Sequence, residues 1–470
     1  MNDSKLIELY RTLSSQEKKQ LQEYVYCDFL NKSREAARLC DFIYQSDNAN
    51  IALDKKKAYQ YAFQQKAYKD SKMRRLMSAL LKLIEDFLLY MYQQTNEKKQ
   101  KINLAEIYFR RGLPKHFNST IRWCEKLQKS DNQANENYYY TQYLIEDIKS
   151  QYLSRQAKRR TEPNLQQVSQ MLDVFYLISK LKKFCAIYVY KNLFKYEYDV
   201  KMLDEILLHI TENDYSDTPL IPLYHAALLV LMGKDDKDYF AELKFLLHKH
   251  NDSLSLQEGK ELHLIARNHC IKKLNKGETK YGQELFELYE TGLNNKVLFS
   301  DNLLYPWTYK NIVAVGLKLK NFDWTEKFIH HYKSFLPAKQ REDAFAFNLA
   351  RLFFEKNEYQ QVIQLLNTMK IDELTVQLDV KVILLKTYYE LEEWNVLFSL
   401  IDSFKIFLRR KKGLGYHKDN YMNIIKYVKQ LSNVNHYDRE AVQKLKQQII
   451  ETHLLTEKKW LLQKVNDFIK

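Results

Sequence analysis

Apolar residues recur along most of this chain at spacings of three and four, which is the period of an amphipathic α-helix. The segment from Asp70 to Tyr92 shows this pattern over its whole length. Two further long helices are expected at about 135–156 and 165–193, on either side of Pro163. Few stretches alternate apolar and polar residues with period two, so β-structure has little support. The pattern predicts about twenty helices joined by short links, and therefore an all-α fold.

Two short motifs mark where helices begin and end. Ser14 is followed three residues later by Glu17, as expected for an N-cap that leads into a helix. Gly112, Leu113 and Pro114 end one helix and start the next, with proline in a first turn.

The longest polar, turn-rich stretch runs from Thr211 to Pro222 and contains two of the six prolines. A second break lies between Asn294 and Pro306. We therefore expect an N-terminal helical region at 1–215 and a C-terminal helical-repeat region at 216–470.

The C-terminal region contains a repeat of an apolar helix, a polar turn, an aromatic residue and a second apolar helix. Trp324, Tyr359 and Trp394 follow the turns and are spaced by 35 and 35 residues. Gly316 and Ala350 take the same place in their first helices, where two helices would cross closely. The first repeat is expected to carry one extra residue in its turn. A fixed period in this range predicts stacked helix hairpins, and hence an α-solenoid with units at about 306–340, 341–373 and 374–412.

The segment 348–369, NLARLFFEKNEYQQVIQLLNTM, resembles a tetratricopeptide repeat, with a small residue at Ala350 and an aromatic at Tyr359. Val362 and Leu385 depart from the small residues of that family. The stretch 305–412 also resembles uncharacterised bacterial helical-repeat proteins, which implies a fold and no activity. The tetratricopeptide resemblance implies binding of a protein or peptide in a concave groove, by analogy.

Composition supports a folded helical chain. Of 470 residues 45% are hydrophobic, with 35 Tyr and 24 Phe but only 9 Gly. Five scattered cysteines without a CxxC pair predict a reducing compartment. The start of the chain has no signal-peptide pattern, and no apolar run reaches the roughly 20 residues of a membrane span. We expect a cytoplasmic protein.

The formal net charge of +15 has two interpretations: a lysine-rich solvated surface, or a surface for nucleic acid or an acidic partner. The basic residues are spread along the chain, with small clusters at 158–160 and 409–412. We expect only weak, non-specific binding of nucleic acid.

No enzyme signature is present: the chain has no glycine-rich phosphate loop, no HExxH and no GxSxG. Arg111 and His116 are separated by Gly112 and Pro114, so they do not share one regular helix. The pairs His330–His331 and His248–His250 lack the spacing of three or four that places metal ligands on one helix face. Next to His269, Cys270 is expected to be a buried structural thiol. We therefore expect no catalytic activity, cofactor or metal.

The best candidate for a functional site is the groove that the tetratricopeptide resemblance implies along the first helix of each pair. Its basic and aromatic lining would suit an acidic or C-terminal peptide. The lining residues would be Lys320, Phe347, Asn348, Arg351, Phe354, Lys386 and Tyr389. Two interpretations stay open: a protein-binding scaffold or adaptor, and a basic solenoid that binds RNA, as pentatricopeptide repeats do with the same period.

Overall fold

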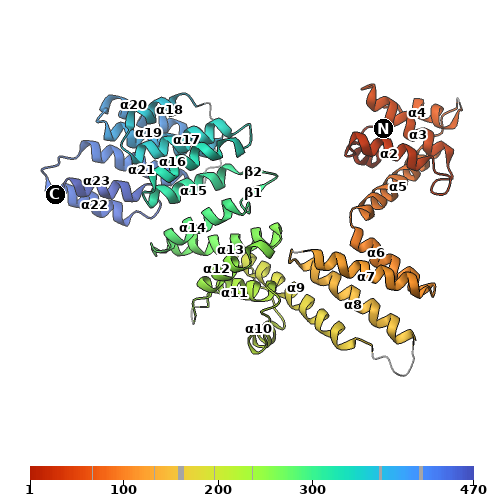
Figure 1. Ribbon diagram of the computed structural model, residues 1–470. Coiled ribbons are helices and arrows are strands. Elements are labelled where there is room, and N and C mark those ends of the chain that lie inside the picture. The colour runs from red at the N-terminus through yellow and green to blue at the C-terminus, as the bar shows by residue number, and fades with distance from the viewer. Residues whose placement is uncertain are drawn as a thin grey trace. The chain divides into compact units, whose positions relative to one another are not determined.

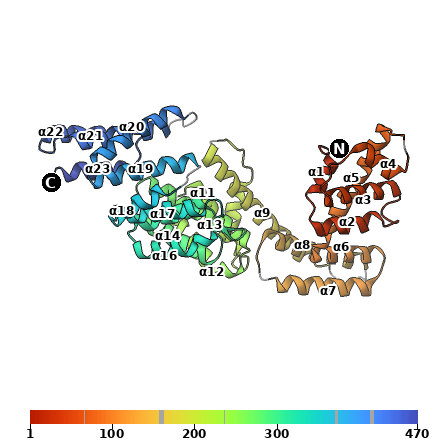
Figure 2. The same cartoon turned by 90° about the horizontal axis from the view of Figure 1, so that it is seen from above.

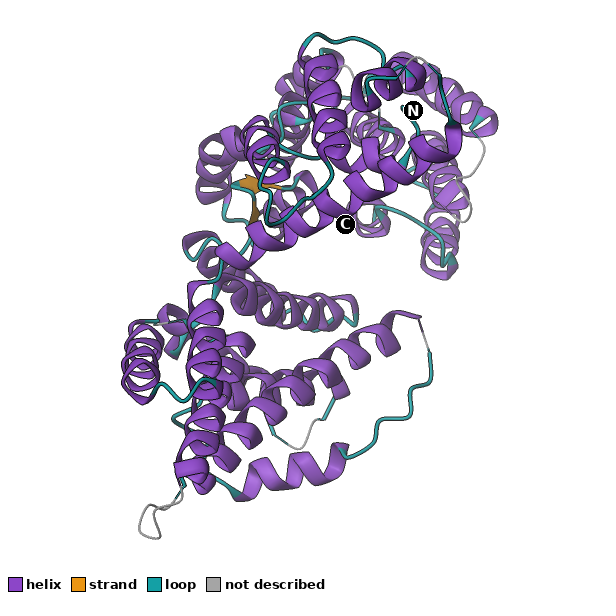
Figure 3. Ribbon diagram, turned by 90° about the vertical axis from the view of Figure 1, so that its right-hand side faces the viewer, coloured by secondary structure: helices purple, strands orange, loops and turns teal. Residues whose placement is uncertain are grey.

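The computed structural model describes residues 1–65, 67–131, 133–156, 163–194, 196–234, 237–369, 373–411 and 417–469. These residues contain twenty-three α-helices, two 3₁₀ turns and one β-hairpin of two short strands (Figures 1 and 3). The all-α prediction is therefore confirmed, and neighbouring helices pack as the hairpins of an α-solenoid. None of the helices that lie within these ranges is both long and apolar enough to cross a lipid bilayer.

The chain divides into two compact units, Met1–Ser179 and Lys180–Lys470. The division falls inside helix α9 (Leu165–Phe194), upstream of the turn-rich segment 211–222 where the sequence places its boundary. Pro163 precedes this helix, as expected.

The first unit contains α1 to α8 and the beginning of α9. The capping motif at its start is confirmed, because the Glu17 amide donates to Ser14 Oγ (3.2 Å) and the Ser14 amide donates to Glu17 Oε2 (2.7 Å). Its helices are α1 (Lys5–Arg11), α2 (Ser15–Val25), α3 (Arg34–Asn48), α4 (Lys55–Phe63), α5 (Asp70–Gln94), α6 (Glu97–Arg110), α7 (Pro114–Ser130) and α8 (Glu136–Gln156).

The second unit continues from α9 through fourteen further α-helices in its described residues. They are α10 (Leu203–Glu212), α11 (Leu220–Met232), α12 (Tyr239–Lys249), α13 (Leu256–Asn275), α14 (Tyr281–Asn294), α15 (Pro306–Lys318), α16 (Phe322–His331), α17 (Arg341–Glu355), α18 (Tyr359–Asn367), α19 (Leu374–Glu390), α20 (Trp394–Arg410), α21 (His417–Asn433), α22 (Arg439–Glu451) and α23 (Lys458–Asp467). The 3₁₀ turns are η1 (Asn251–Ser253) and η2 (Tyr332–Phe335).

Helix hairpins in this unit stack on one another. The pairs α11/α12, α13/α14, α15/α16, α17/α18 and α19/α20 pack internally, and first helices contact the next first helix at α11/α13, α15/α17 and α17/α19. One continuous apolar core runs from Phe347 to Val465. Each hairpin thus buries its apolar faces against its neighbours, as expected for a repeat that cannot form a core alone.

One turn geometry closes the repeated hairpins. The backbone is in the left-handed conformation at Lys320, Asn357 and Glu392, with φ of 59°, 61° and 57°. In each turn this residue donates its amide to the carbonyl three positions back, at 3.0–3.1 Å. The next residue donates to the carbonyl five positions back, at 2.8–3.0 Å. This is the Schellman motif, which satisfies carbonyls at a helix C-terminus.

The same turn occurs well outside the three predicted units. Asn50, Gly112, Gly233 and Gly277 are also left-handed and make the same two hydrogen bonds. They join α3 to α4, α6 to α7, α11 to α12 and α13 to α14. The hairpin repeat therefore extends into both units, although its sequence period is visible only in the C-terminal half.

The turns also correct the predicted register of the first repeat. Helix α16 begins at Phe322, so Phe322 corresponds to Tyr359 and Trp394, whereas Trp324 lies two residues inside the helix. The turn has no extra residue; the first spacing is 37 because the link from α16 to α17, which includes η2, is longer. Ala350 therefore corresponds to Val313, not to Gly316, and both side chains are fully buried.

A small β-hairpin interrupts the helices before α15. Strand β1 (Phe299–Ser300) pairs antiparallel with β2 (Leu303–Leu304), and Asp301 and Asn302 form its two-residue turn with φ of 50° and 60°. Two positive φ angles identify a type I′ turn, for which aspartate and asparagine are suited. The hairpin leads directly into Tyr305, the residue that caps α15.

Candidate functional site

A cavity of about 990 Å³ opens on the face formed by the first helices α15, α17 and α19. Its walls come from the start of α15, the segment that leads into α17, the first turns of α17 and the start of α19. They are mostly apolar, and they include Tyr305, Pro306, Trp307, Pro337, Ala344, Phe347 and Val376. A concave, largely apolar pocket with a few polar groups is the usual form of a binding site.

Two aromatic side chains at the rim are left exposed by the way α15 begins. Pro306 is the first residue of the helix, a position that proline favours, and Tyr305 precedes it in an extended conformation. Tyr305 is 57% exposed and Trp307 is 69% exposed. Large aromatic groups this open to solvent beside an apolar cavity are a typical feature of interaction surfaces.

Charge at this cavity is balanced. Lys310 and Lys339 are on its walls together with Asp343 and Glu373. The Lys310 ammonium is already paired with Asp379 at 2.5 Å, and it lies 5.7 Å from the Trp307 ring and 5.4 Å from the Phe347 ring. The cavity therefore offers aromatic and apolar contact rather than a concentration of positive charge.

The structure brings only two of the seven predicted groove residues to this cavity, Phe347 and Asn348. Asn348 is buried and donates to the Ala344 carbonyl at 2.8 Å. Lys320 is exposed, but it lies in the turn between α15 and α16, where its left-handed backbone closes the hairpin.

Arg351 ties two first helices together instead of lining an open groove. Its Nη1 donates to the Lys310 carbonyl of α15 at 3.3 Å and to Asn348 Oδ1 at 3.4 Å. Burial lowers the pKa of its guanidinium, and the nearby carboxylates of Glu457 and Asp379 oppose that change. Arg351 is half-buried, and its guanidinium already has partners in its own chain, so it is not a free cation waiting for a peptide.

Lys386, Phe354 and Tyr389 are buried, which also contradicts their expected exposure. The reason is the C-terminal helix α23, which lies beside α19 (Figure 2). The Lys386 ammonium bonds Glu457 Oε2 at 2.8 Å and lies 4.2 Å from the Phe354 ring. The basic, aromatic surface that the sequence assigned to an acidic partner therefore meets an acidic residue of its own chain.

Helix α23 is held to the end of α19 by further polar contacts. Trp460 Nε1 donates to Glu390 Oε1 at 2.7 Å, and Lys464 pairs with Glu390 Oε2 at 2.6 Å. The Trp460 ring also packs edge-on against Tyr389 at 5.3 Å. Among the described residues, the part of the predicted groove that borders an open cavity is the part next to α15, at Phe347 and Asn348.

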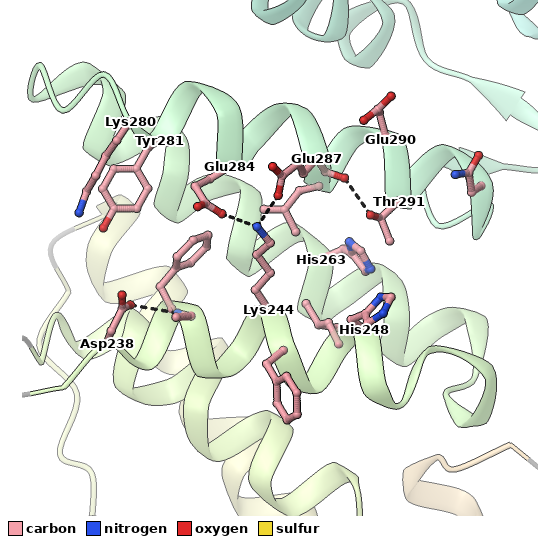
Figure 4. A pocket seen from close by; sticks show the side chains of 16 residues that line it. Asp238, Lys244, His248, His263, Lys280, Tyr281, Glu284, Glu287, Glu290 and Thr291 are labelled. Atoms are coloured by element: carbon pink, nitrogen blue, oxygen red, sulfur yellow. Dashed lines mark hydrogen bonds and ion pairs between the residues drawn. The ribbon is translucent and has the colours of Figure 1, made fainter.

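A second cavity, of about 750 Å³, lies between α12 and α14 and is floored by α13 (Figure 4). The Lys244 ammonium lies between two carboxylates of α14, 2.6 Å from Glu284 Oε2 and 2.5 Å from Glu287 Oε2. The hydrogen bond from Lys244 lowers the pKa of Glu287, and burial opposes this shift.

This second cavity was not predicted from the sequence. Its signal was present, because Tyr281, Glu284, Glu287 and Thr291 recur at spacings of three and four and so share one face of α14. The sequence gives no indication of which helix faces them. His248 lines the cavity, whereas its sequence neighbour His250 does not, and the second histidine is His263 of α13.

The other residues considered for chemistry are not assembled into a site. Arg111 caps α6, whereas His116 lies in α7 against Tyr108, with 5.2 Å between ring centroids. His330 and His331 are exposed on α16. His269 stacks on Phe240 at 5.0 Å, and Cys270 is fully buried, as expected for a structural thiol. Across the residues the structure describes, no three His, Cys, Asp or Glu side chains are grouped to hold a metal ion.

Comparison of the chain with protein-family models, with curated proteins and with solved structures found no match. The assignment to a helical-repeat fold therefore depends on the hairpin geometry described above.

Proposed function

We propose that this protein is a non-enzymatic interaction scaffold that binds a peptide segment of a partner protein in the α15–α17–α19 cavity. The observation that carries the proposal is the exposure of Trp307 beside about 990 Å³ of mostly apolar space. Tryptophan and tyrosine contribute disproportionately to binding energy at interfaces, because they bury a large area with few rotatable bonds.

The balanced charge of the cavity indicates the kind of segment it would take. Lys310 is paired with Asp379, so an acidic peptide would have to compete with a carboxylate already in place. An extended segment with an apolar or proline anchor would instead use the aromatic rim formed by Tyr305 and Trp307. Proline-containing peptides dock in aromatic-lined grooves in this way.

The test is a selection of displayed random peptides on the purified protein, with counter-selection on the Trp307→Ala variant. Trp307 is exposed, so the substitution should leave thermal unfolding nearly unchanged. We expect enriched peptides that share an apolar or proline anchor and fail to bind the variant. If no peptide is enriched, or if enriched peptides bind both proteins equally, the proposal is wrong.

A second candidate function, binding of single-stranded nucleic acid, is favoured by one local feature. Tyr190, Phe194 and Tyr196 are 54%, 58% and 62% exposed, with adjacent ring centroids 5.7 and 6.1 Å apart. Tyr190 and Phe194 are stacked, and exposed aromatic rings are typical of surfaces on which bases stack. This function would require salt-dependent binding of an oligonucleotide that Tyr190→Ala weakens; we expect only non-specific binding, with a Kd of roughly 10⁻⁴ to 10⁻⁶ M.

A further inference from the structure

The cavity between α12 and α14 is acidic on a chain that is strongly basic overall. Its walls include the carboxylates of Asp238, Glu284, Glu287 and Glu290, against the ammonium groups of Lys244 and Lys280. With its histidines neutral, the cavity has an excess of two negative charges, whereas the whole chain has a net charge of +15. A local field opposite in sign to the rest of the surface selects for cations.

The acceptors are distributed along the length of the cavity. Figure 4 shows Asp238, Lys280 and Tyr281 at one end, Glu284, Lys244 and Glu287 in the middle, and His248 and His263 at the other end. Each carboxylate has about four acceptor positions. Glu284 accepts one hydrogen bond from Lys244, and Glu287 accepts one from Lys244 and one from Gln283 at 3.3 Å. Capacity to accept further hydrogen bonds therefore remains in the middle of the cavity.

His263 supplies an independent indication of a ligand. Its side chain is 2% exposed, its ring lines the cavity, and its Nδ1 has no hydrogen-bond partner. Burial, with a smaller contribution from the charge of Arg267, lowers its pKa to about 4, so the ring is neutral near pH 7. A buried polar atom without a partner is costly, and a donor from a bound molecule would satisfy it.

We propose that this cavity binds an extended organic cation with two or more amino or guanidino groups, which donate to Glu284, Glu287 and His263. Tyr281 at one end is not needed for this role, because the ammonium groups of Lys280 and Lys273 already lie 5.2 and 5.8 Å from its ring centroid. Such a ligand is either a free polyamine or the lysine and arginine side chains of a basic peptide segment. This site is separate from the cavity at Trp307 and does not depend on the function proposed for it.

Lys244 makes the proposal testable, because its ammonium occupies the position that a ligand amine would seek. If Lys244 only fastens α12 to α14, replacing it would lower stability and would create no affinity for cations. If the cavity is a cation site, Lys244→Gln would free Glu284 and Glu287 and tighten binding. The double variant Glu284→Gln/Glu287→Gln would abolish it.

The experiment is calorimetric titration of the full chain with spermidine and, separately, with an acetylated tri-lysine peptide amide. We expect saturable binding that is about tenfold tighter in Lys244→Gln, equivalent to about 1.4 kcal/mol. The double glutamine variant should not bind, and Glu242→Gln, an exposed position of α12 outside this cavity, should match the original protein. Tighter binding of spermidine would identify a polyamine site, and tighter binding of the peptide would identify a site for a basic segment.

Nitrogen-detected NMR of the histidine side chains provides the second readout. Spermidine should shift the Nδ1 resonance of His263 and leave that of the exposed His330 in place. The proposal is overturned if neither probe binds, if Lys244→Gln does not tighten binding, or if the His263 resonance is unmoved at saturation.

Discussion

A methyl group placed on Gly316 of α15 would lie 2.2 Å from Thr325 Oγ1 of α16. Thr325 is fully buried and its hydroxyl donates to the Asn321 carbonyl at 2.7 Å. The first hairpin of the repeat can close only because residue 316 has no side chain. The sequence pattern predicts a close crossing at Gly316, and this contact confirms it, although the residue does not correspond to Ala350.

Gly316→Ala should therefore destabilise the protein. Alanine is the better helix former by about 1 kcal/mol, but forcing an extra methyl into a packed contact costs about 1–3 kcal/mol. Chemical denaturation should show a net loss. The control is Gly282→Ala in α14, where the added methyl would lie 3.4 Å from Leu319 Cδ2 and stability should be unchanged or higher.

The loss at Gly316 should be recovered in part by Thr325→Ala, which removes the clashing oxygen. The two substitutions should be less damaging together than the sum of their separate effects. If the changes in unfolding free energy of the two single variants simply add up in the double variant, then residues 316 and 325 do not clash, and this prediction is wrong.

At the left-handed turn residue Glu392, we expect a substitution to raise the stability of the protein rather than lower it. A non-glycine residue in this conformation costs about 1 kcal/mol, so Glu392→Gly should raise stability. Glu393, the next residue, has φ of −79°, and Glu393→Gly should lower stability instead. Thermal unfolding of the two variants, which differ by one position, checks the turn register directly.

Lys386→Glu should destabilise the C-terminal end of the stack. The substitution would place a second carboxylate next to Glu457 in a site where Lys386 is 7% exposed. Because the Glu457 side chain is 37% exposed, solvent screens this pair, and we expect a loss of about 1 kcal/mol or more. Circular dichroism on heating should show the loss, and Lys386→Glu/Glu457→Lys should restore part of it; an unchanged melting temperature for the single variant would show that α23 is not docked here.

His263 should make the fold sensitive to mild acid. Its folded pKa is about 4 against an ordinary value of 6.5, so the unfolded chain takes up a proton first as the pH falls between these values. Stability should therefore be lost across that window, by at most about 3 kcal/mol. His263→Gln should flatten this part of the stability profile, measured by chemical denaturation at a series of pH values between 4 and 7.

The helices were predictable from sequence because the spacing of their apolar residues and the residues that start and end them are local features. Ser14, Pro114 and Pro163 each mark a helix boundary that the structure confirms. The positions of the turns could be predicted only in part, because a residue with a left-handed backbone need not be glycine. Lys320, Asn357 and Glu392 have the same backbone geometry, but their side chains have no chemical feature in common. Counting back 35 residues from Tyr359 therefore aligned Trp324 with it, whereas the structure aligns Phe322 with Tyr359.

The candidate site was less predictable because it depends on contacts between distant segments. The tetratricopeptide pattern assigns Lys386 to a first helix, but it does not show that Glu457, 71 residues later, pairs with it. Nor did any local pattern indicate that Trp307, at the first turn of α15, would be left 69% exposed beside a cavity. Long-range docking, rather than helix periodicity, decides which part of the face stays open.

The central claim is that Trp307 anchors a bound peptide, and its most direct test is the affinity of a selected peptide for two tryptophan variants. Trp394 is the matched control, because it is 37% exposed on the same stack and lies outside the cavity. We expect Trp307→Ala to weaken binding about a hundredfold, within the 2–4 kcal/mol typical of an aromatic anchor, and Trp394→Ala to leave it unchanged. Equal affinity of the original protein and Trp307→Ala, with both folded, would contradict the account.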